Sequence, residues 1–263
     1  MVNYAERRMN KLPTLPMFLL LFYMLISPGQ VIPMELNQQP FVLEEQIPIL
    51  MYHEIGIPSG PWKELYVKPE TFARQLDWIK ANGYSTVQLK DVFNHWYKKF
   101  PLPEKPIVIT FDDGYRNMYD KVLPLLVERK MKATFFLYPR KFNTPNGLTK
   151  DMVVSLAEKG MEIGSHTLNH LDLTKISGTK LQQELLGSKL LLEKMINKPV
   201  NFICYPSGRF NDQIINEVRK YGYLGAVTTQ MGKASINQNP FQWKRIRINF
   251  SDGVNGFIKK ISN

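Results

Sequence analysis

Two adjacent carboxylates follow a continuous apolar run in the middle of the chain. Asp112 and Asp113 come directly after residues 107–111, Ile-Val-Ile-Thr-Phe, and precede Gly114. Two neighbouring carboxylates at the end of a buried segment are difficult to keep ionised together without a cation. A divalent metal ion could supply that positive charge. One Asp would then bind the metal, and the other would stay free to act as a base. The alternative is a structural turn, because Asp-Gly is a frequent turn pair and Asp is a good helix cap.

Two histidines four residues apart form the second candidate motif. His166 and His170 lie in Ser165-His-Thr-Leu-Asn-His170. On a helical turn this spacing places both imidazoles on one side, where both can reach one ion. Two unconnected loop histidines are the alternative. Two His and one Asp are a common catalytic zinc set, so with Asp113 as the third ligand the two motifs explain each other.

A third histidine, His53, follows the apolar run at residues 47–52. An unperturbed pKa near 6.5 would let it give a proton to a leaving group near neutral pH, which suits a general acid. A third metal ligand and a structural histidine that caps a loop are the alternatives.

The elements that must position these residues alternate between β-rich runs and amphipathic helical stretches. Strands are predicted at 47–52, 84–89, 107–111, 133–138, 161–164, 202–205, 225–228 and 245–250, and helices at 69–82, 89–99, 118–130, 149–159, 179–197, 211–221 and 253–261. This alternation predicts an α/β fold of the β/α-barrel type, in which catalytic groups lie just past the C-terminal ends of the strands. An open doubly wound sheet is the second choice, but neither GxGxxG nor GxxxxGK is present.

The composition and the N-terminus restrict the class of protein further. One cysteine among 263 residues excludes a disulfide framework and any multi-Cys metal site. Arg7, Arg8 and Lys11 precede an apolar run at residues 15–26, which predicts a secretory signal or an uncleaved anchor within residues 1–30. We expect a linker at 31–46, one catalytic domain at 47–263, and membrane association, if any, through residues 12–26.

Export has consequences for location and partners. We expect a secreted or cell-surface protein, anchored to the membrane if the signal is not cleaved. The net charge of +11 favours polyanionic surroundings, but export makes nucleic acid an unsuitable partner. A monomer is expected.

Three motifs together resemble a known family. Thr110-Phe-Asp-Asp-Gly114 and Ser165-His-Thr-Leu-Asn-His170 resemble the first two motifs of the polysaccharide deacetylases (NodB-homology, carbohydrate esterase family 4). Tyr205-Pro-Ser-Gly208 is similar to the third motif. The resemblance covers residues 47–263 and implies a distorted (β/α)7 barrel. It also implies that members remove acetyl groups from N-acetylglucosamine polymers, peptidoglycan, chitin or acetylated xylan.

The resemblance implies a role for each matching residue. Asp113, His166 and His170 would bind one divalent metal, usually zinc, with Ni²⁺ or Co²⁺ as alternatives, and Asp112 would be the general base. The stretch Tyr205, Pro206, Ser207 and Gly208 would bind substrate and supply a backbone N–H to the oxyanion.

Two departures from the family pattern change the expected site. Most members carry an Arg just upstream of the third-motif proline, but residues 202–205 are Phe-Ile-Cys-Tyr, so Arg245 or Arg247 on the last predicted strand is expected to orient the base. The usual late histidine is also absent. Leu50-Met-Tyr-His-Glu54 instead resembles the subgroup that deacetylates poly-β-1,6-N-acetylglucosamine, where that histidine is N-terminal, so His53 takes the acid role.

The expected function is hydrolysis of N-acetyl groups on an N-acetylglucosamine polysaccharide of an exopolysaccharide or a cell wall. An O-acetyl xylan esterase and a catalytically silent carbohydrate-binding relative are the alternatives.

Overall fold

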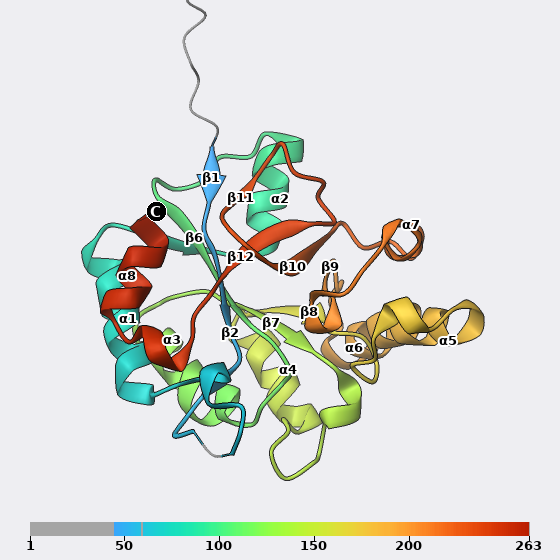
Figure 1. Ribbon diagram of the computed structural model, residues 1–263, viewed down its shortest axis with the longest axis horizontal. Coiled ribbons are helices and arrows are strands. Elements are labelled where there is room, and N and C mark those ends of the chain that lie inside the picture. The colour runs from blue at the N-terminus through green and yellow to red at the C-terminus, as the bar shows by residue number, and fades with distance from the viewer. Residues whose placement is uncertain (1–44, 59, 263) are drawn as a thin grey trace, which may run out of the picture. The chain divides into compact units, whose positions relative to one another are not determined.

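The computed structural model of the protein describes residues 45–58 and 60–262 (Figure 1). The predicted signal or anchor at 1–30, with its segment 12–26, and nearly all of the predicted linker lie outside these residues. None of the helices within the described ranges has the length and apolar character that a bilayer span requires.

Seven parallel strands form a closed ring. Their order around the ring is β2, β6, β7, β8, β9, β10 and β12, and the pairing of β2 with β6 closes it. The strands are β2 (Ile49–Tyr52), β6 (Pro106–Phe111), β7 (Thr134–Leu137), β8 (Glu162–Ser165), β9 (Phe202–Cys204), β10 (Gly225–Met231) and β12 (Trp243–Arg247). Closure confirms the predicted (β/α)7 barrel and excludes the open sheet.

Several predicted strands differ from the observed ones in length or place. The strand predicted at 84–89 is β5 (Ser85–Val87), which pairs with β6 outside the ring. The strand predicted at 245–250 is β12, which begins and ends earlier. Gln46 lies in the predicted linker but opens β1 (Gln46–Ile47), which pairs with β11 (Ala234–Ser235). A further short pair joins β3 (Glu54–Ile55) to β4 (Tyr66–Val67).

Helices surround the ring (Figure 1). They are α1 (Pro69–Ala81), α2 (Leu89–Lys98), α3 (Leu123–Glu128), α4 (Lys150–Glu158), α5 (Gly178–Gln182), α6 (Ser188–Ile196), α7 (Asp212–Lys220) and α8 (Asn255–Ser262). The single helix predicted at 179–197 is divided by a π-helical turn, Gln183–Gly187. Local signals explain several ends: the Asn211 side chain accepts the Ile214 N–H at the start of α7, and Gly83 and Gly160, after α1 and α4, have φ of 75° and 80°.

Alternate residues of each strand face inward and outward. Ile107, Ile109 and Phe111 of β6 pack against the helices, whereas Val108 belongs to a second apolar cluster inside the ring. That inner cluster includes Trp243 and Phe202, stacked 5.9 Å apart, and extends to Trp96 of α2, which therefore closes the N-terminal end of the barrel. The polar candidate residues therefore lie at the opposite end of the barrel, where the strands have their C-terminal ends.

Candidate active site

Asp113, His166 and His170 converge at the C-terminal end of the barrel. The Nε2 atoms of both histidines lie 3.4 Å from Asp113 Oδ1, and the three donor atoms all lie within 4.8 Å of one another. Asp113 follows β6 and His166 follows β8, whose neighbour β7 separates them in the sheet. The structure therefore brings together the three side chains that the sequence grouped.

The two histidines are not on a helical turn, so the structural reason given for their spacing is wrong. Residues 166–170 form a loop in which Thr167 and His170 have φ of 65° and 58°. Two non-glycine residues in the left-handed region turn the chain back, so the imidazole rings come to 4.7 Å between centroids. The two imidazoles therefore meet as predicted, but a loop conformation and not a helical turn brings them together.

A buried carboxylate from another element holds this loop. Glu184, in the π-helical turn between α5 and α6, is fully buried and accepts the N–H groups of Leu168 and Asn169 at 3.1 and 2.8 Å. Its second oxygen accepts the Asn169 side chain at 2.6 Å. These bonds satisfy the buried carboxyl oxygens and fix the loop between the two histidines. Glu184 was not among the residues predicted from the sequence, because nothing in its local sequence distinguishes it from other helical glutamates.

We predict that Glu184→Gln weakens metal binding about 10–100-fold, in the range seen when groups that orient metal ligands are changed. The glutamine would replace an acceptor oxygen with an NH₂ that faces donor groups of the loop. Metal titration of the purified chain measures the effect, with Glu158→Gln on the exposed end of α4 as the control. Equal affinity in the two variants would contradict the positioning role.

The donor set fits a divalent metal ion. His166 Nδ1 lies 2.7 Å from the backbone carbonyl of Cys204 and donates its proton there, while Nε2 faces Asp113, where an ion would take the Nε2 lone pair in place of a second proton. Burial lowers the pKa of His170, which keeps that ring neutral, and Asp113 has a pKa lowered to about 2 because the contact with His166 outweighs burial. Ligands of a tetrahedral ion with bonds of about 2.0–2.1 Å lie about 3.3–3.4 Å apart, which matches both Asp113 contacts.

Asp112 lies inside the barrel, next to the three-residue set. It is 2% exposed and is held by both terminal nitrogens of Arg245, at 2.8 and 2.7 Å. Burial alone would raise the pKa of Asp112, but the Arg245 guanidinium holds it well below its usual range. Asp112 is therefore an ionised carboxylate in a fixed orientation.

Arg245 is itself fully buried and fixed by further acceptors. Its Nε donates to the Thr228 carbonyl at 2.9 Å, and its Nη1 also donates to the Thr110 hydroxyl at 3.0 Å. Cys204 Sγ lies 3.0 Å from Nη2. Of the two arginines proposed from the sequence, Arg245 binds the aspartate. Arg247 is half-buried on the same strand, and its carbonyl accepts the Lys260 ammonium.

His53 faces the same aspartate from the end of β2. Its Nε2 lies 3.9 Å from Asp112 Oδ2, and the side chain is nearly buried. Burial lowers the pKa of His53, although Asp112 and Asp113 oppose that effect. The resting imidazole is therefore neutral at neutral pH.

The third-motif stretch borders the site from β9, but most of it is committed to the fold. The Tyr205 ring is buried, stacks on Phe210 and donates its hydroxyl to the Phe241 carbonyl at 3.1 Å. The Tyr205 and Gly208 amides donate to the carbonyls of Val227 and Tyr205, and Pro206 has no N–H. Ser207, with φ of 55°, is the remaining member of the predicted oxyanion group.

A second group of potential ligands, Asp112, His166 and Cys204, also lies within 4.8 Å. It is a poor metal site, because the Arg245 cation already neutralises Asp112. Burial also raises the pKa of the Cys204 thiol, which disfavours the thiolate a metal would need.

Comparisons with known proteins find related sequences and a related fold. A family model described as polysaccharide deacetylase matches residues 99–226. YxkH of Bacillus subtilis (strain 168), itself named as a polysaccharide deacetylase, is 35% identical over 211 residues, 80% of this chain and 74% of the relative. The poly-beta-1,6-N-acetyl-D-glucosamine N-deacetylase of Staphylococcus aureus (strain N315) is 26% identical over 212 residues, 75% of this chain and 72% of the relative.

A solved structure extends the likeness over nearly the whole barrel. The Streptococcus pyogenes deacetylase PplD, in complex with acetate, is similar with a TM-score of 0.78 and 29% identity. The alignment covers 82% of this chain and 98% of PplD.

Proposed function

Because the chain belongs to the polysaccharide deacetylase family, we propose that it hydrolyses the N-acetyl groups of an N-acetylglucosamine polysaccharide with the help of one divalent metal ion. The observation that carries the proposal is the meeting of Asp113, His166 and His170 beside the Asp112–Arg245 pair at one end of the barrel. A silent carbohydrate-binding relative would need neither group. The likeness to the Staphylococcus aureus enzyme favours poly-β-1,6-N-acetylglucosamine over other acetylated polymers.

Asp113, His166 and His170 would hold the ion, which we expect to be Zn²⁺. An ion held there would polarise the acetamide carbonyl and lower the pKa of the attacking water from about 15.7 toward 7. The Cys204 carbonyl keeps His166 in the tautomer that ligation needs.

Asp112 and His53 would move the protons. Asp112 accepts a proton from the attacking water, and until that step Arg245 keeps the carboxylate ionised and correctly oriented. Since its pKa is held low, Asp112 releases that proton readily. His53, neutral at rest and 3.9 Å away, is placed to take it up and to give it to the departing amine nitrogen as the carbon–nitrogen bond breaks. The products are acetate and a glucosamine unit.

The tetrahedral oxyanion would need a donor on the third-motif side of the site. By elimination within Tyr205–Gly208, we assign this role to the Ser207 N–H. Removing one such donor typically lowers kcat about 10²–10³-fold in other enzymes.

Acetate release is the direct test of the function. The full chain, loaded with Zn²⁺, is incubated with poly-β-1,6-N-acetylglucosamine, chitooligosaccharide, peptidoglycan and acetylated xylan, and acetate is measured enzymatically. Turnover of an amide substrate that exceeds turnover of xylan supports the proposal. Release from xylan alone would make the protein an esterase, and no release from any substrate would favour the silent relative.

We predict that Zn²⁺ raises the melting temperature of the chain and that His170→Ala removes this effect together with activity. An ion that binds only the folded state at 100 times its Kd stabilises by about 2.7 kcal/mol. His170 is partly exposed, so its removal should cost the ion-free chain little. His95→Ala is the control, because His95 lies on α2 and binds Glu45 and the Phe100 carbonyl. Equal Zn²⁺ stabilisation of both variants would contradict the assigned ligands.

We also propose that the protein acts outside the cell, from the predicted signal or anchor at residues 1–30. Fractionation of expressing cells into medium, membrane and cytosol tests this, and recovery in the cytosol would contradict it.

A further inference from the structure

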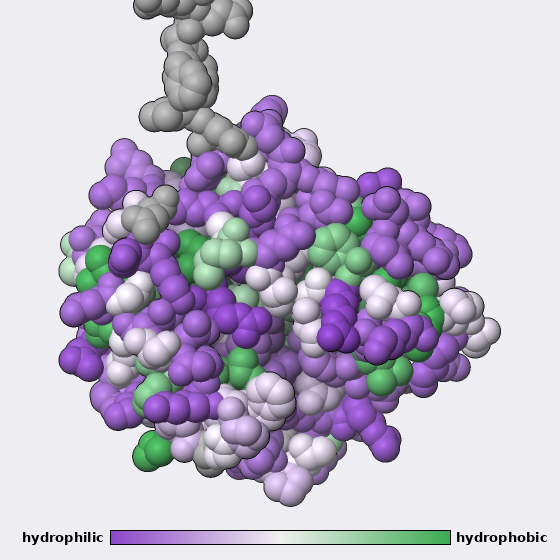
Figure 2. Space-filling view, viewed as in Figure 1, coloured by the Kyte–Doolittle hydropathy of each residue, from purple (hydrophilic) through white to green (hydrophobic). Residues whose placement is uncertain are grey.

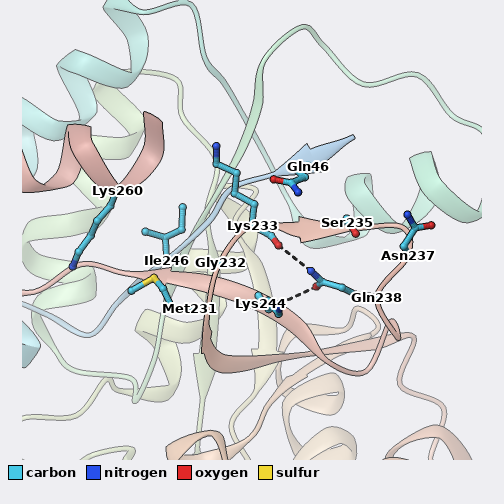
Figure 3. A pocket seen from close by; sticks show the side chains of 10 residues that line it. All are labelled: Gln46, Met231, Gly232, Lys233, Ser235, Asn237, Gln238, Lys244, Ile246 and Lys260. Carbon is cyan, nitrogen blue, oxygen red and sulfur yellow. Dashed lines mark hydrogen bonds between the residues drawn. The ribbon is translucent and has the colours of Figure 1, made fainter. Parts of the chain in front are cut away.

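A lysine-lined groove lies on the outer wall of the barrel, on the opposite face of β12 from Arg245. Its volume is about 650 Å³, and Figure 3 shows the side chains that line it. They come from β1, the end of β10, the β11 segment, β12 and α8: Gln46, Met231, Gly232, Lys233, Ser235, Asn237, Gln238, Lys244, Ile246 and Lys260. Lys244 and Ile246 alternate along β12 with Arg245, so the groove and the Asp112 pair use opposite sides of one strand.

The hollow exists because the connection from β10 to β12 contains no helix. It instead turns at Gly232, forms β11 and returns through Gln238. Gly232 has φ of 145°, and a Cβ there would come 3.1 Å from the Lys244 side chain. The Gln238 side chain braces the walls, since it donates to the Lys233 carbonyl at 2.9 Å and accepts the Lys244 N–H at 3.2 Å. The groove is therefore a braced part of the fold.

The groove carries positive charge that the fold does not neutralise. Lys233, Lys244 and Lys260 are all partly buried, and no described residue that lines the groove is acidic. Lys260 is engaged by Asp252 and the Arg247 carbonyl. In the described part of the chain, the ammonium groups of Lys233 and Lys244 have neither an ion pair nor a hydrogen bond. In Figure 3, Lys233 and Lys260 lie on either side of Ile246, and Figure 2 shows mostly hydrophilic side chains on the face that carries β11 and β12.

We propose that this groove binds a phosphodiester-bearing polymer, independently of the deacetylation site. Cavities of about 300–1,000 Å³ hold ligands the size of a few polymer units. Lysine ammonium groups bind phosphate oxygens as compact point charges, and no acidic side chain among the described lining residues competes with a phosphate for them. The amide side chains of Gln46 and Asn237 add hydrogen-bonding groups for the hydroxyls of such a chain.

A polymer suits the groove better than a membrane surface. The lysines line a concavity between the β11 segment and α8, a shape that suits an extended chain better than a flat bilayer. A bound polyanion would retain the enzyme near an anionic matrix while the barrel mouth stays free for its own substrate.

The test measures binding of fluorescently labelled poly(glycerol phosphate) to the full chain at 50–200 mM salt. The double variant Lys233→Gln/Lys244→Gln is expected to bind at least tenfold more weakly. The matched control Lys159→Gln/Lys180→Gln, which removes the same charge from exposed positions on other elements, is expected to change affinity by less than twofold. Acetate release from chitooligosaccharide should be unchanged in both double variants. Because this assay does not depend on polymer binding, a failure of the proposed deacetylase function can be distinguished from a failure of the binding proposal.

Four results would overturn the proposal. The first is the absence of polymer binding by the unaltered chain, and the second is an equal loss of polymer binding in both double variants. The third is tighter binding of polygalacturonate than of poly(glycerol phosphate) by the unaltered chain. The fourth is a Lys233→Gln/Lys244→Gln variant that no longer binds phosphatidylglycerol vesicles but still binds the polymer. The second would reduce the effect to net charge, the third would favour carboxylates, and the fourth would make the groove a membrane contact.

Discussion

Replacing Asp112 by asparagine is expected to lower kcat for acetate release about 10²–10⁴-fold, the range that positioned acid–base groups contribute. The asparagine keeps the shape of the side chain but cannot accept the proton of the attacking water. Asp113, His166 and His170 are untouched, so the metal content of the purified variant should equal that of the unaltered chain. The measurement is turnover at saturating Zn²⁺ and substrate, together with metal analysis.

The variant also changes a buried ion pair, so activity must be read on folded protein. Circular dichroism and thermal unfolding set a temperature at which both chains are fully folded, and kcat is compared there. Asp120→Asn is the matched control, since Asp120 pairs with Arg116 on the surface. Loss of metal together with activity would show that Asp112 is a ligand and not the base, and unchanged kcat would remove it from the mechanism.

Much of the barrel could be predicted from local pattern. The run 107–111 is apolar without interruption because β6 is buried on both faces, and such runs identify parallel strands. The division of the helix predicted at 179–197 was harder to predict, because the apolar periodicity continues through the π-helical turn between α5 and α6. The early end of β12 was missed because the residues after it, Ile248 and Phe250, are also β-formers.

The site was predictable where its residues are adjacent in sequence and harder to predict where they meet only in space. Asp112-Asp113 and the two histidines were recognised from spacing, although the loop that joins the histidines is not helical. Arg245 could be named only as one of two choices, because Arg245 and Arg247 share one side of β12 and only the three-dimensional structure shows which of them reaches Asp112. Glu184 could not be predicted from the sequence, because its three hydrogen bonds join a π-helical turn to a loop that lies elsewhere in the sequence.

Replacing Arg245 by methionine is expected to lower the free energy of unfolding by about 3–5 kcal/mol, because it leaves the Asp112 carboxylate buried without a partner. For a domain of this size, that corresponds to a fall in melting temperature of about 10 °C. Arg247→Met, two residues along the same strand, is the control, and only a small change is expected there. Thermal and denaturant unfolding of the metal-free chains measure the difference.

The pH dependence of this difference follows from the pKa of Asp112. In the unaltered protein the folded pKa lies well below the unfolded value of about 3.9, so the stabilisation is complete above that value and is lost only as the pH falls through the folded pKa. In Arg245→Met, burial remains without the guanidinium, and the folded pKa rises above the unfolded one. That variant should therefore lose stability as the pH rises from about 4 through neutral, whereas Asp112 makes no such contribution in the unaltered chain.

The double variant Asp112→Asn/Arg245→Met separates the ion pair from the packing around it. A neutral amide costs less to bury than an unpaired carboxylate, so the double variant should be at least as stable as Arg245→Met alone and should lose the Asp112-dependent slope with pH. Its activity should remain as low as that of Asp112→Asn, because the double variant still lacks the carboxylate that acts as the base. If the two single losses of stability simply added, Arg245 would not be acting on Asp112, and the orientation of the base would have to be assigned elsewhere.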